Sequence, residues 1–257
     1  MRIQMNDVNF SYNKGRQILH DINLDLDGPG LYCIIGPNGV GKSTMIKCMN
    51  KLLTPESGSV LLDGEDVSKM TAKKVAEKIA YVPVSSEDVF SMTVFETILI
   101  GRGSKKSLKT SKEDILKVHK IMEALDLEEF FNRSYRDMSA GQRQKVAIAR
   151  GIVQEKEILI LDEPTSNLDV RHQMYVTELL RELAYRKNMM VIMISHNLGI
   201  TVKFADKLIA MENPGKIMCV GSVDEVITVD NMRRLYDIEC DVVQHEGRPA
   251  IMYKSLD

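Results

Sequence analysis

The sequence predicts an α/β fold: a mostly parallel sheet core with an N-terminal antiparallel β subdomain and a helical insertion. The apolar runs EILILD (157–162) and NMMVIMIS (188–195) are typical of strands that are buried on both faces. Between them, an apolar stripe at 176–183 has helical spacing. Apolar strands that alternate with helices indicate a parallel sheet that is covered on both sides.

The first third of the chain is expected to open with strands before helices join the pattern. The second strand alternates apolar and polar residues, and a turn at Gly28, Pro29 and Gly30 follows it. Thr71 occupies the N-cap position of an expected short helix. The expected elements are strands at 2–12, 18–27, 31–36 and 60–64 and helices at 44–53 and 71–80.

The segment 93–153 differs from its surroundings because its pattern is almost wholly helical, and it predicts the insertion. Ser111 lies three residues before Asp114, which is the spacing of a helix N-cap. The basic stretch 103–112 is interpreted as a solvated loop. One helical face is expected to bury Ile115, Val118, Met122 and Leu125.

The α/β alternation resumes after this insertion, and 238–253 predicts a hairpin that turns around Glu246 and Gly247. The sequence has no evident internal repeat or low-complexity linker. We therefore expect a single domain over 1–257. Its α/β core would comprise 1–91 and 154–257, with the C-terminal hairpin, and 92–153 would form the helical subdomain.

Composition excludes several classes of protein. The net charge of −2 lacks the basic excess typical of nucleic-acid binding, so no nucleic-acid partner is expected. No apolar run approaches the roughly 18 residues of a spanning helix, and the N-terminus lacks a signal-peptide profile, so we expect a cytosolic protein. The cysteines have no metal-ligand spacing and are expected to be reduced and mostly buried: Cys33, Cys48, Cys219 and Cys240.

The stretch GPNGVGKST at 36–44 directly follows an expected strand and matches a phosphate-binding P-loop. Glycines allow a tight backbone that turns its N–H groups toward anionic oxygens, and a helix N-terminus adds its positive dipole end. We expect Lys42 to reach the β- and γ-phosphates and Ser43 to bind Mg²⁺ through its hydroxyl. A plain strand–turn–helix is the alternative.

Two carboxylates, Asp162 and Glu163, end the apolar strand in ILILDEP. Ligand sites of parallel sheets lie at the carboxyl ends of their strands, so this is the expected place for the metal partner of a P-loop. Asp162 is the candidate second metal residue, acting through the water shell of the ion. Glu163 would polarise the attacking water. Alone the motif is weak, because Asp and Pro commonly close strands.

The stretch MSAGQRQKVAIAR at 138–150 resembles the signature of the ATP-binding cassette (ABC) ATPases. The order of the motifs along the chain is similar to theirs: Tyr12, the P-loop, the signature, ILILDEP, 166–169 and then His196, an isolated histidine after the apolar run VIMIS. The resemblance covers nearly the whole chain. It implies a P-loop NTPase fold of the ABC type and hydrolysis of ATP with Mg²⁺ as cofactor.

The resemblance also implies roles for particular residues. Tyr12 would stack on adenine, Ser139 and Gly141 would contact the γ-phosphate, His196 would be the switch histidine, and Asp169 would couple two sites. The implied catalytic residues are Lys42, Glu163 and His196, and the metal residues are Ser43 and Asp162. The implied nucleotide-binding residues are Tyr12, Gly36, Pro37, Asn38, Gly39, Val40, Gly41, Lys42, Ser43, Thr44, Ser139, Gly141, Gln142 and Asp169.

Partners follow from the same resemblance. The signature of one subunit closes over the P-loop of another, so two copies of this chain, or one copy with a homologous partner, would enclose two ATP molecules. Two copies of a separate transmembrane permease subunit would hold this dimer on the cytoplasmic face of the cell membrane as a peripheral protein. A substrate-binding protein would be an indirect partner.

Three positions depart from the family pattern. Val84 occupies the position of a glutamine that touches the metal, and valine can neither ligate nor hydrogen-bond. Ser85, Ser86 or Glu87 is a candidate replacement, or the metal relies on Ser43, Asp162 and water. We expect slower or less tightly coupled hydrolysis. Two signature positions are also substituted, by Met138 and Ala140, and the loop should tolerate the methyl group if φ of Ala140 is negative.

Three segments resemble importers of iron chelates, haem and cobalamin: TVFETILIGR, GSVDEVITVDNMRRLYDIECDVV and GRPAIMY. The alternatives are an ABC importer for another cargo such as molybdate or zinc, a soluble ATPase of iron–sulphur assembly, and a nucleotide-gated switch with little turnover. A small-molecule kinase is disfavoured because it would need neither the signature nor His196.

Overall fold

A computed structural model describes residues 1–12, 15–84, 92–103 and 111–255. The expected basic loop at 103–112 and the candidate residues Ser85, Ser86 and Glu87 fall largely or wholly outside these ranges. Within them, none of the helices is long and apolar enough to cross a membrane.

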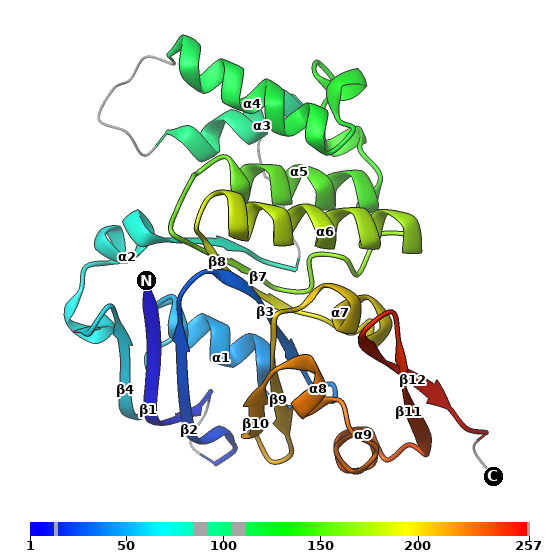
Figure 1. Ribbon diagram of the computed structural model, residues 1–257. Coiled ribbons are helices and arrows are strands. Elements are labelled where there is room, and N and C mark those ends of the chain that lie inside the picture. Colours follow the sequence, from blue (N-terminus) through cyan, green and yellow to red (C-terminus); the bar gives the residue numbers. More distant parts are fainter. Residues whose placement is uncertain (13–14, 85–91, 104–110, 256–257) are drawn as a thin grey trace.

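A six-stranded sheet forms the centre of the molecule, in the order β10-β9-β3-β8-β7-β6 (Figure 1). All neighbouring strands in it are parallel except β9 and β10. The predicted mostly parallel core is therefore confirmed. Its strands are β3 (Gly30–Ile35), β6 (Ile79–Val82), β7 (Ile158–Leu161), β8 (Met190–Ile194), β9 (Lys207–Glu212) and β10 (Lys216–Gly221).

A second sheet is antiparallel and contains the first two strands of the chain, in the order β2-β1-β4-β5. This confirms the expected N-terminal β subdomain. The C-terminal hairpin is also confirmed, with Glu246 and Gly247 both at positive φ in its turn. The strands are β1 (Arg2–Ser11), β2 (Gln17–Asp27), β4 (Ser57–Leu62), β5 (Glu65–Asp66), β11 (Cys240–His245) and β12 (Arg248–Tyr253).

Helices cover both faces of the six-stranded sheet, and α3 to α6 lie above it in Figure 1. The α-helices are α1 (Lys42–Met49), α2 (Ala72–Lys78), α3 (Val94–Leu99), α4 (Lys112–Ala124), α5 (Ala140–Ile152), α6 (Val170–Arg186), α7 (Leu198–Phe204), α8 (Val223–Val226) and α9 (Val229–Tyr236). Short 3₁₀ turns occupy Val67–Lys69, Ile100–Arg102, Glu128–Phe130 and Tyr135–Asp137.

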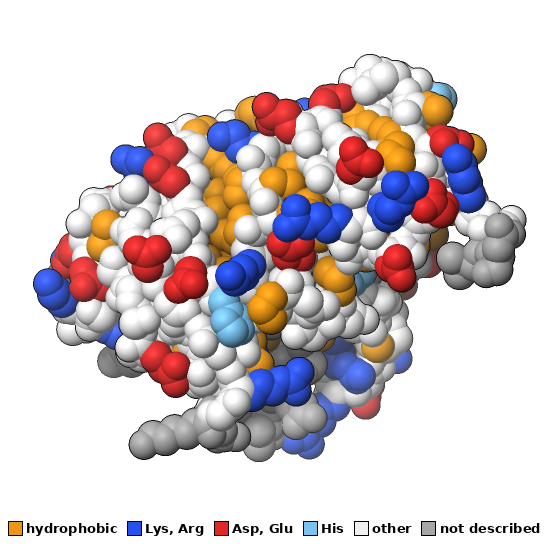
Figure 2. All heavy atoms as spheres, turned by 90° about the horizontal axis from the view of Figure 1, so that it is seen from below, with side chains coloured by type: hydrophobic (Ala, Val, Ile, Leu, Met, Phe, Trp, Pro, Cys, Tyr) orange, Lys and Arg blue, Asp and Glu red, His pale blue; other side chains and the backbone are white. Residues whose placement is uncertain are grey.

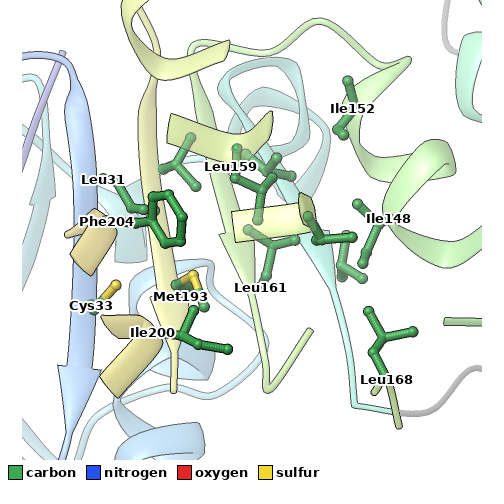
Figure 3. Close-up of a cluster of buried hydrophobic side chains, with 14 of the residues drawn as sticks. Leu31, Cys33, Ile148, Ile152, Leu159, Leu161, Leu168, Met193, Ile200 and Phe204 are labelled. Atoms are coloured by element: carbon green, nitrogen blue, oxygen red, sulfur yellow. The ribbon is translucent and has the colours of Figure 1, made fainter. Parts of the chain in front are cut away.

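The unbroken apolar strands are explained by two hydrophobic cores, one on each face of the sheet. Alternate residues of one strand serve different cores, because successive side chains point to opposite faces. In β7, Leu159 and Leu161 pack under the helices, whereas Ile158 and Ile160 pack against the antiparallel sheet and α1. Figure 3 shows the first core, where α5 and α7 cover the strands.

One expected helix was too long. The helix predicted at 71–80 ends at Lys78, and Ile79–Val82 instead form β6, which pairs in parallel with β7. No glycine or proline separates the two elements, so the local pattern gave no boundary. Backbone pairing with β7 overrides the helical spacing. The cap prediction is confirmed, because Thr71 accepts a hydrogen bond from the Lys74 N–H at 3.2 Å.

The helical segment agrees with its predicted pattern. Ser111 caps α4 by accepting from the Asp114 N–H at 3.0 Å. Three of the four stripe residues, Val118, Met122 and Leu125, are fully buried, while Ile115 is half-buried. The helix predicted to start at 44 begins two residues earlier, at Lys42.

The mixed surface charge and the burial of the cysteines agree with what the composition predicted. Acidic and basic side chains are interspersed around hydrophobic ones on the face seen from below (Figure 2). All four cysteines are free, and all except the half-buried Cys219 are buried. Burial raises the pKa of the Cys48 thiol to about 12, so this sulfur remains a protonated core group.

Candidate functional site

The candidate site lies at the carboxyl ends of three adjacent parallel strands. The P-loop follows β3, Asp162 and Glu163 follow β7, and His196 follows β8 with one residue between. Parallel pairing places these three ends at one edge of the sheet. Residues that are far apart in sequence are therefore brought together.

The P-loop backbone requires glycine because other chain segments approach it closely. Gly36, Gly39 and Gly41 all have positive φ, of 142°, 77° and 102°. A Cβ on Gly36 would lie 2.1 Å from the carbonyl oxygen of Met211 in β9. A Cβ on Gly41 would lie 2.9 Å from the Leu19 side chain in β2. The loop is thus held between both sheets.

Lys42 is buried within the loop that carries it. Its Nζ donates hydrogen bonds to the carbonyl oxygens of Gly36 and Pro37, both at 2.7 Å. Burial lowers the pKa of Lys42, and the nearby carboxylates Glu163 and Asp162 oppose that shift. The ammonium group therefore lies inside the curve of the loop, beside the two acids. Of the other P-loop positions, Asn38 and Val40 lie in the turn before α1, and Thr44 lies in the first turn of α1.

Ser43 and Asp162 meet across the site. The Ser43 hydroxyl donates to Oδ1 of Asp162 at 2.9 Å, and the Tyr81 hydroxyl donates to Oδ2 at 3.4 Å. Asp162 is buried, and this desolvation raises its pKa. A hydroxyl and a carboxylate at this separation are the hard oxygen donors that Mg²⁺ prefers. Tyr81 was not expected, because no motif marked it and the strand β6 that carries it was not predicted.

Glu163 and His196 form a second pair beside the first. His196 Nε2 lies 2.6 Å from Oε1 of Glu163. Glu163 itself has a φ of 48°, in the left-handed region that side chains other than glycine rarely adopt. Both side chains line a cavity of about 600 Å³, so the pair faces open space rather than core.

Tyr12 lies at the end of β1 next to the P-loop. Its hydroxyl is 3.2 Å from the Thr44 hydroxyl, and its ring packs edge-on against Phe10 with centroids 5.0 Å apart. Tyr12 as a whole residue is 55% exposed, so its side chain is accessible beside the loop. An accessible aromatic face is what base stacking requires.

The signature residues cap a helix. The Ser139 hydroxyl accepts from the Gln142 N–H at 3.3 Å, while the Gln142 side chain accepts from the Ser139 N–H at 2.9 Å. Ala140 is the first residue of α5 and does not have positive φ, so the loop tolerates its methyl group. Within the described ranges, no hydrogen bond joins these residues to the P-loop.

Gly141 and Asp169 connect the signature to the segment after β7. A Cβ on Gly141 would lie 2.9 Å from the carbonyl oxygen of Asn167. Asp169 caps α6 by accepting from the His172 N–H at 2.9 Å, and its other oxygen lies 2.8 Å from His172 Nδ1. These hydrogen bonds lower the pKa of Asp169. Its capping function was not anticipated.

Val84 follows β6 at a bend and is partly exposed. The Asp162 N–H donates to the carbonyl of Val82 at 2.8 Å, so this bend lies beside the candidate metal residues. An apolar side chain at this position offers no ligand.

Comparisons with known proteins agree with this geometry. The ABC transporter family profile matches residues 19–166. An ABC transporter ATP-binding protein of Methanocaldococcus jannaschii is 36% identical over 252 residues, 98% of each chain. A siderophore transport ATP-binding protein of Bacillus subtilis is 34% identical over 229 residues, which cover 88% of this chain and 83% of the relative.

Among solved structures, an inward-facing transporter assigned to the metal-chelate type matches with a TM-score of 0.81. The two chains are 25% identical, and the match covers 99% of this chain and 97% of that one. The similarity extends beyond the P-loop core to the helical segment and the C-terminal hairpin.

The close approach of β9 to the P-loop predicts a position-specific effect of glycine substitution. Gly36→Ala should abolish measurable nucleotide binding and lower the melting temperature, because its methyl group cannot coexist with the Met211 carbonyl. Gly64→Ala is the matched control, since Gly64 also has positive φ (82°) but has open space around it. It should lose only about 1–2 kcal/mol of stability. Equal effects of the two substitutions would contradict this interpretation.

Proposed function

The chain belongs to the ABC transporter family as one of its ATP-binding cassette ATPases, and on this premise we propose that it powers an importer. The cargo would be an iron chelate, haem or a cobalamin-type substrate, carried through a separate membrane permease. The siderophore relative and the metal-chelate transporter support the iron-chelate class. A relative named for cobalamin import supports the wider class.

The observation that carries the proposal is the convergence of four side chains at one sheet edge. Ser43 lies 2.9 Å from Asp162, and Glu163 lies 2.6 Å from His196. The first pair offers oxygen ligands to Mg²⁺, which would neutralise phosphate charge when bound. Glu163 of the second pair directly follows Asp162 of the first, so its carboxylate lies beside the metal residues, where it can act on water.

The proposed mechanism assigns each group a distinct step. Backbone N–H groups of 36–44 and the Lys42 ammonium bind the ATP phosphates and offset their charge. Glu163 accepts a proton from the attacking water through its carboxylate. His196 holds that carboxylate through Nε2 and contacts the γ-phosphate. Tyr12 supports the adenine ring by stacking.

The signature residues require a second chain in this proposal. Ser139, Gly141 and Gln142 have no hydrogen bond to the P-loop within the described part of their own chain, so they would serve the ATP of a partner copy. Asp169 would couple the two sites of that dimer. The helical segment 92–153 would then act as the signature subdomain of a single ABC domain over 1–257.

Membrane association is proposed to occur through other proteins. Two copies of a permease subunit would hold the dimer at the cytoplasmic face of the membrane, and a substrate-binding protein would deliver cargo on the other side. The described helices include none that could span a bilayer, which is compatible with peripheral attachment.

Turnover separates a transport ATPase from a nucleotide-gated switch. Glu163→Gln should lower phosphate release at least about a hundredfold, because a glutamine amide cannot accept the water proton. ATP affinity should stay within about twofold of the parent, since Lys42 and the loop are unchanged. Steady turnover in the variant, or none in the parent, would contradict the assignment of Glu163.

Val84 predicts weak coupling between permease and hydrolysis. Val84→Gln adds a polar group that can reach the metal region, so permease-stimulated turnover should increase several-fold. Val84→Leu is the matched control, because it lengthens the side chain without a polar atom. An unchanged rate in the glutamine variant would show that the valine does not limit hydrolysis.

The partner and the cargo class can be tested together. The tagged chain, purified from membranes, should bring down a permease that supports ATP-dependent uptake of an iron chelate in vesicles. Molybdate and zinc are the comparison cargoes. Recovery of a soluble iron–sulphur assembly scaffold in place of a permease would contradict the proposal.

A further inference from the structure

Gln173, in the first turn of α6, connects two segments of the site. Its Nε2 donates to the carbonyl oxygens of Thr165 at 3.1 Å and Leu168 at 3.0 Å. Its Oε1 accepts from Nδ2 of Asn197 at 2.8 Å. Both amide protons and the carbonyl oxygen are therefore used. No motif in the sequence pointed to this residue.

The two connected segments carry Glu163 and His196, the pair proposed to act on water. The loop from Glu163 to Asp169 contains both carbonyl acceptors, and Asn197 directly follows His196. Glu163 and His196 also join the two segments directly, because His196 Nε2 lies 2.6 Å from Oε1 of Glu163. Gln173 lines the same cavity as these residues. Its side chain thus bonds to both segments that carry Glu163 and His196.

Helix capping does not explain these bonds. The N-terminus of α6 is already capped by Asp169, and Asn197 caps α7 with its other amide atom, Oδ1, which accepts from the Ile200 N–H at 3.2 Å. The Asn197 Nδ2 is left to bond to Gln173. The interaction between the two amides is therefore a separate connection between α6 and the segment after β8.

We propose that Gln173 is a positioning residue that fixes the 163–169 loop and the segment around His196 relative to each other. Since this inference rests on the proposed function, it concerns how accurately Glu163 and His196 meet, not whether ATP binds. Small misplacements of a catalytic group reduce rates steeply. Breaking the connection should therefore lower turnover while leaving nucleotide affinity unchanged.

Two variants cut the connection from opposite sides. Asn197→Asp keeps an oxygen to cap α7 and loses the donor to Gln173. Gln173→Met is uncharged and of similar length, and it loses all three bonds. The control is Gln154→Met, because the one hydrogen bond of the Gln154 side chain within the described residues goes to the Arg150 carbonyl near the end of α5, at 3.2 Å.

Steady-state kinetics form the first test. Both connection variants should show kcat lowered about tenfold, with ATP affinity within twofold of the parent and melting temperatures close to that of Gln154→Met. Full kcat in both would overturn the proposal. A lowered melting temperature with unchanged kcat would also overturn it, because Gln173 would then have only a structural role.

Hydrogen exchange without nucleotide tests the connection independently of hydrolysis. The N–H groups of Ser166 and Leu168 bond within the loop, to the carbonyls of Glu163 and Thr165. Asn197→Asp lies on the far side of the connection, yet it should accelerate exchange at both amides several-fold. Unchanged exchange there would overturn the connection. Absence of turnover in the parent would instead contradict the proposed function, and the exchange result would still decide this inference.

Discussion

Parallel pairing of β3, β7 and β8 is the constraint on which the site depends. Ile34 pairs with Ile194, and Leu161 pairs with Met193, so β3 and β7 each end within about one residue of the end of β8, which lies between them. A slip of one residue would move a strand end by about 3.3 Å and turn its side chains to the other face. The contact between Ser43 and Asp162 would not survive such a shift.

The two hydrophobic cores keep this register fixed. Each central strand buries both faces, so a slipped strand would exchange side chains between differently shaped cores. The glycines of the P-loop then allow β2 and β9 to approach from either side. Stability and function are linked here, because the groups that pack the sheet also set the distances within the site.

Much of the fold and of the candidate site could be predicted from sequence, since each main motif is a short continuous stretch of the chain. The P-loop, Asp162 and His196 each follow an apolar strand. In a parallel sheet the carboxyl ends of the strands lie at one edge, so these residues are expected to lie close together. What could not be predicted depends on tertiary contacts. Strand β6 was missed because only pairing with β7 distinguishes its first residues, Ile79 and Ala80, from a helix end, and no motif marked Tyr81. Gln173 was missed because no motif includes it and its contact with Asn197, 24 residues further along the chain, depends on the tertiary fold.

The central claim is that the loop at 36–44 binds the phosphates of ATP through its amides and the Lys42 ammonium. Calorimetric titration with ATP and Mg²⁺ tests it most directly. The parent chain should bind one ATP, and Lys42→Ala should bind at least about tenfold more weakly, since a charge-assisted contact is lost. Equal affinity in the two proteins, or no heat of binding in the parent, would contradict it.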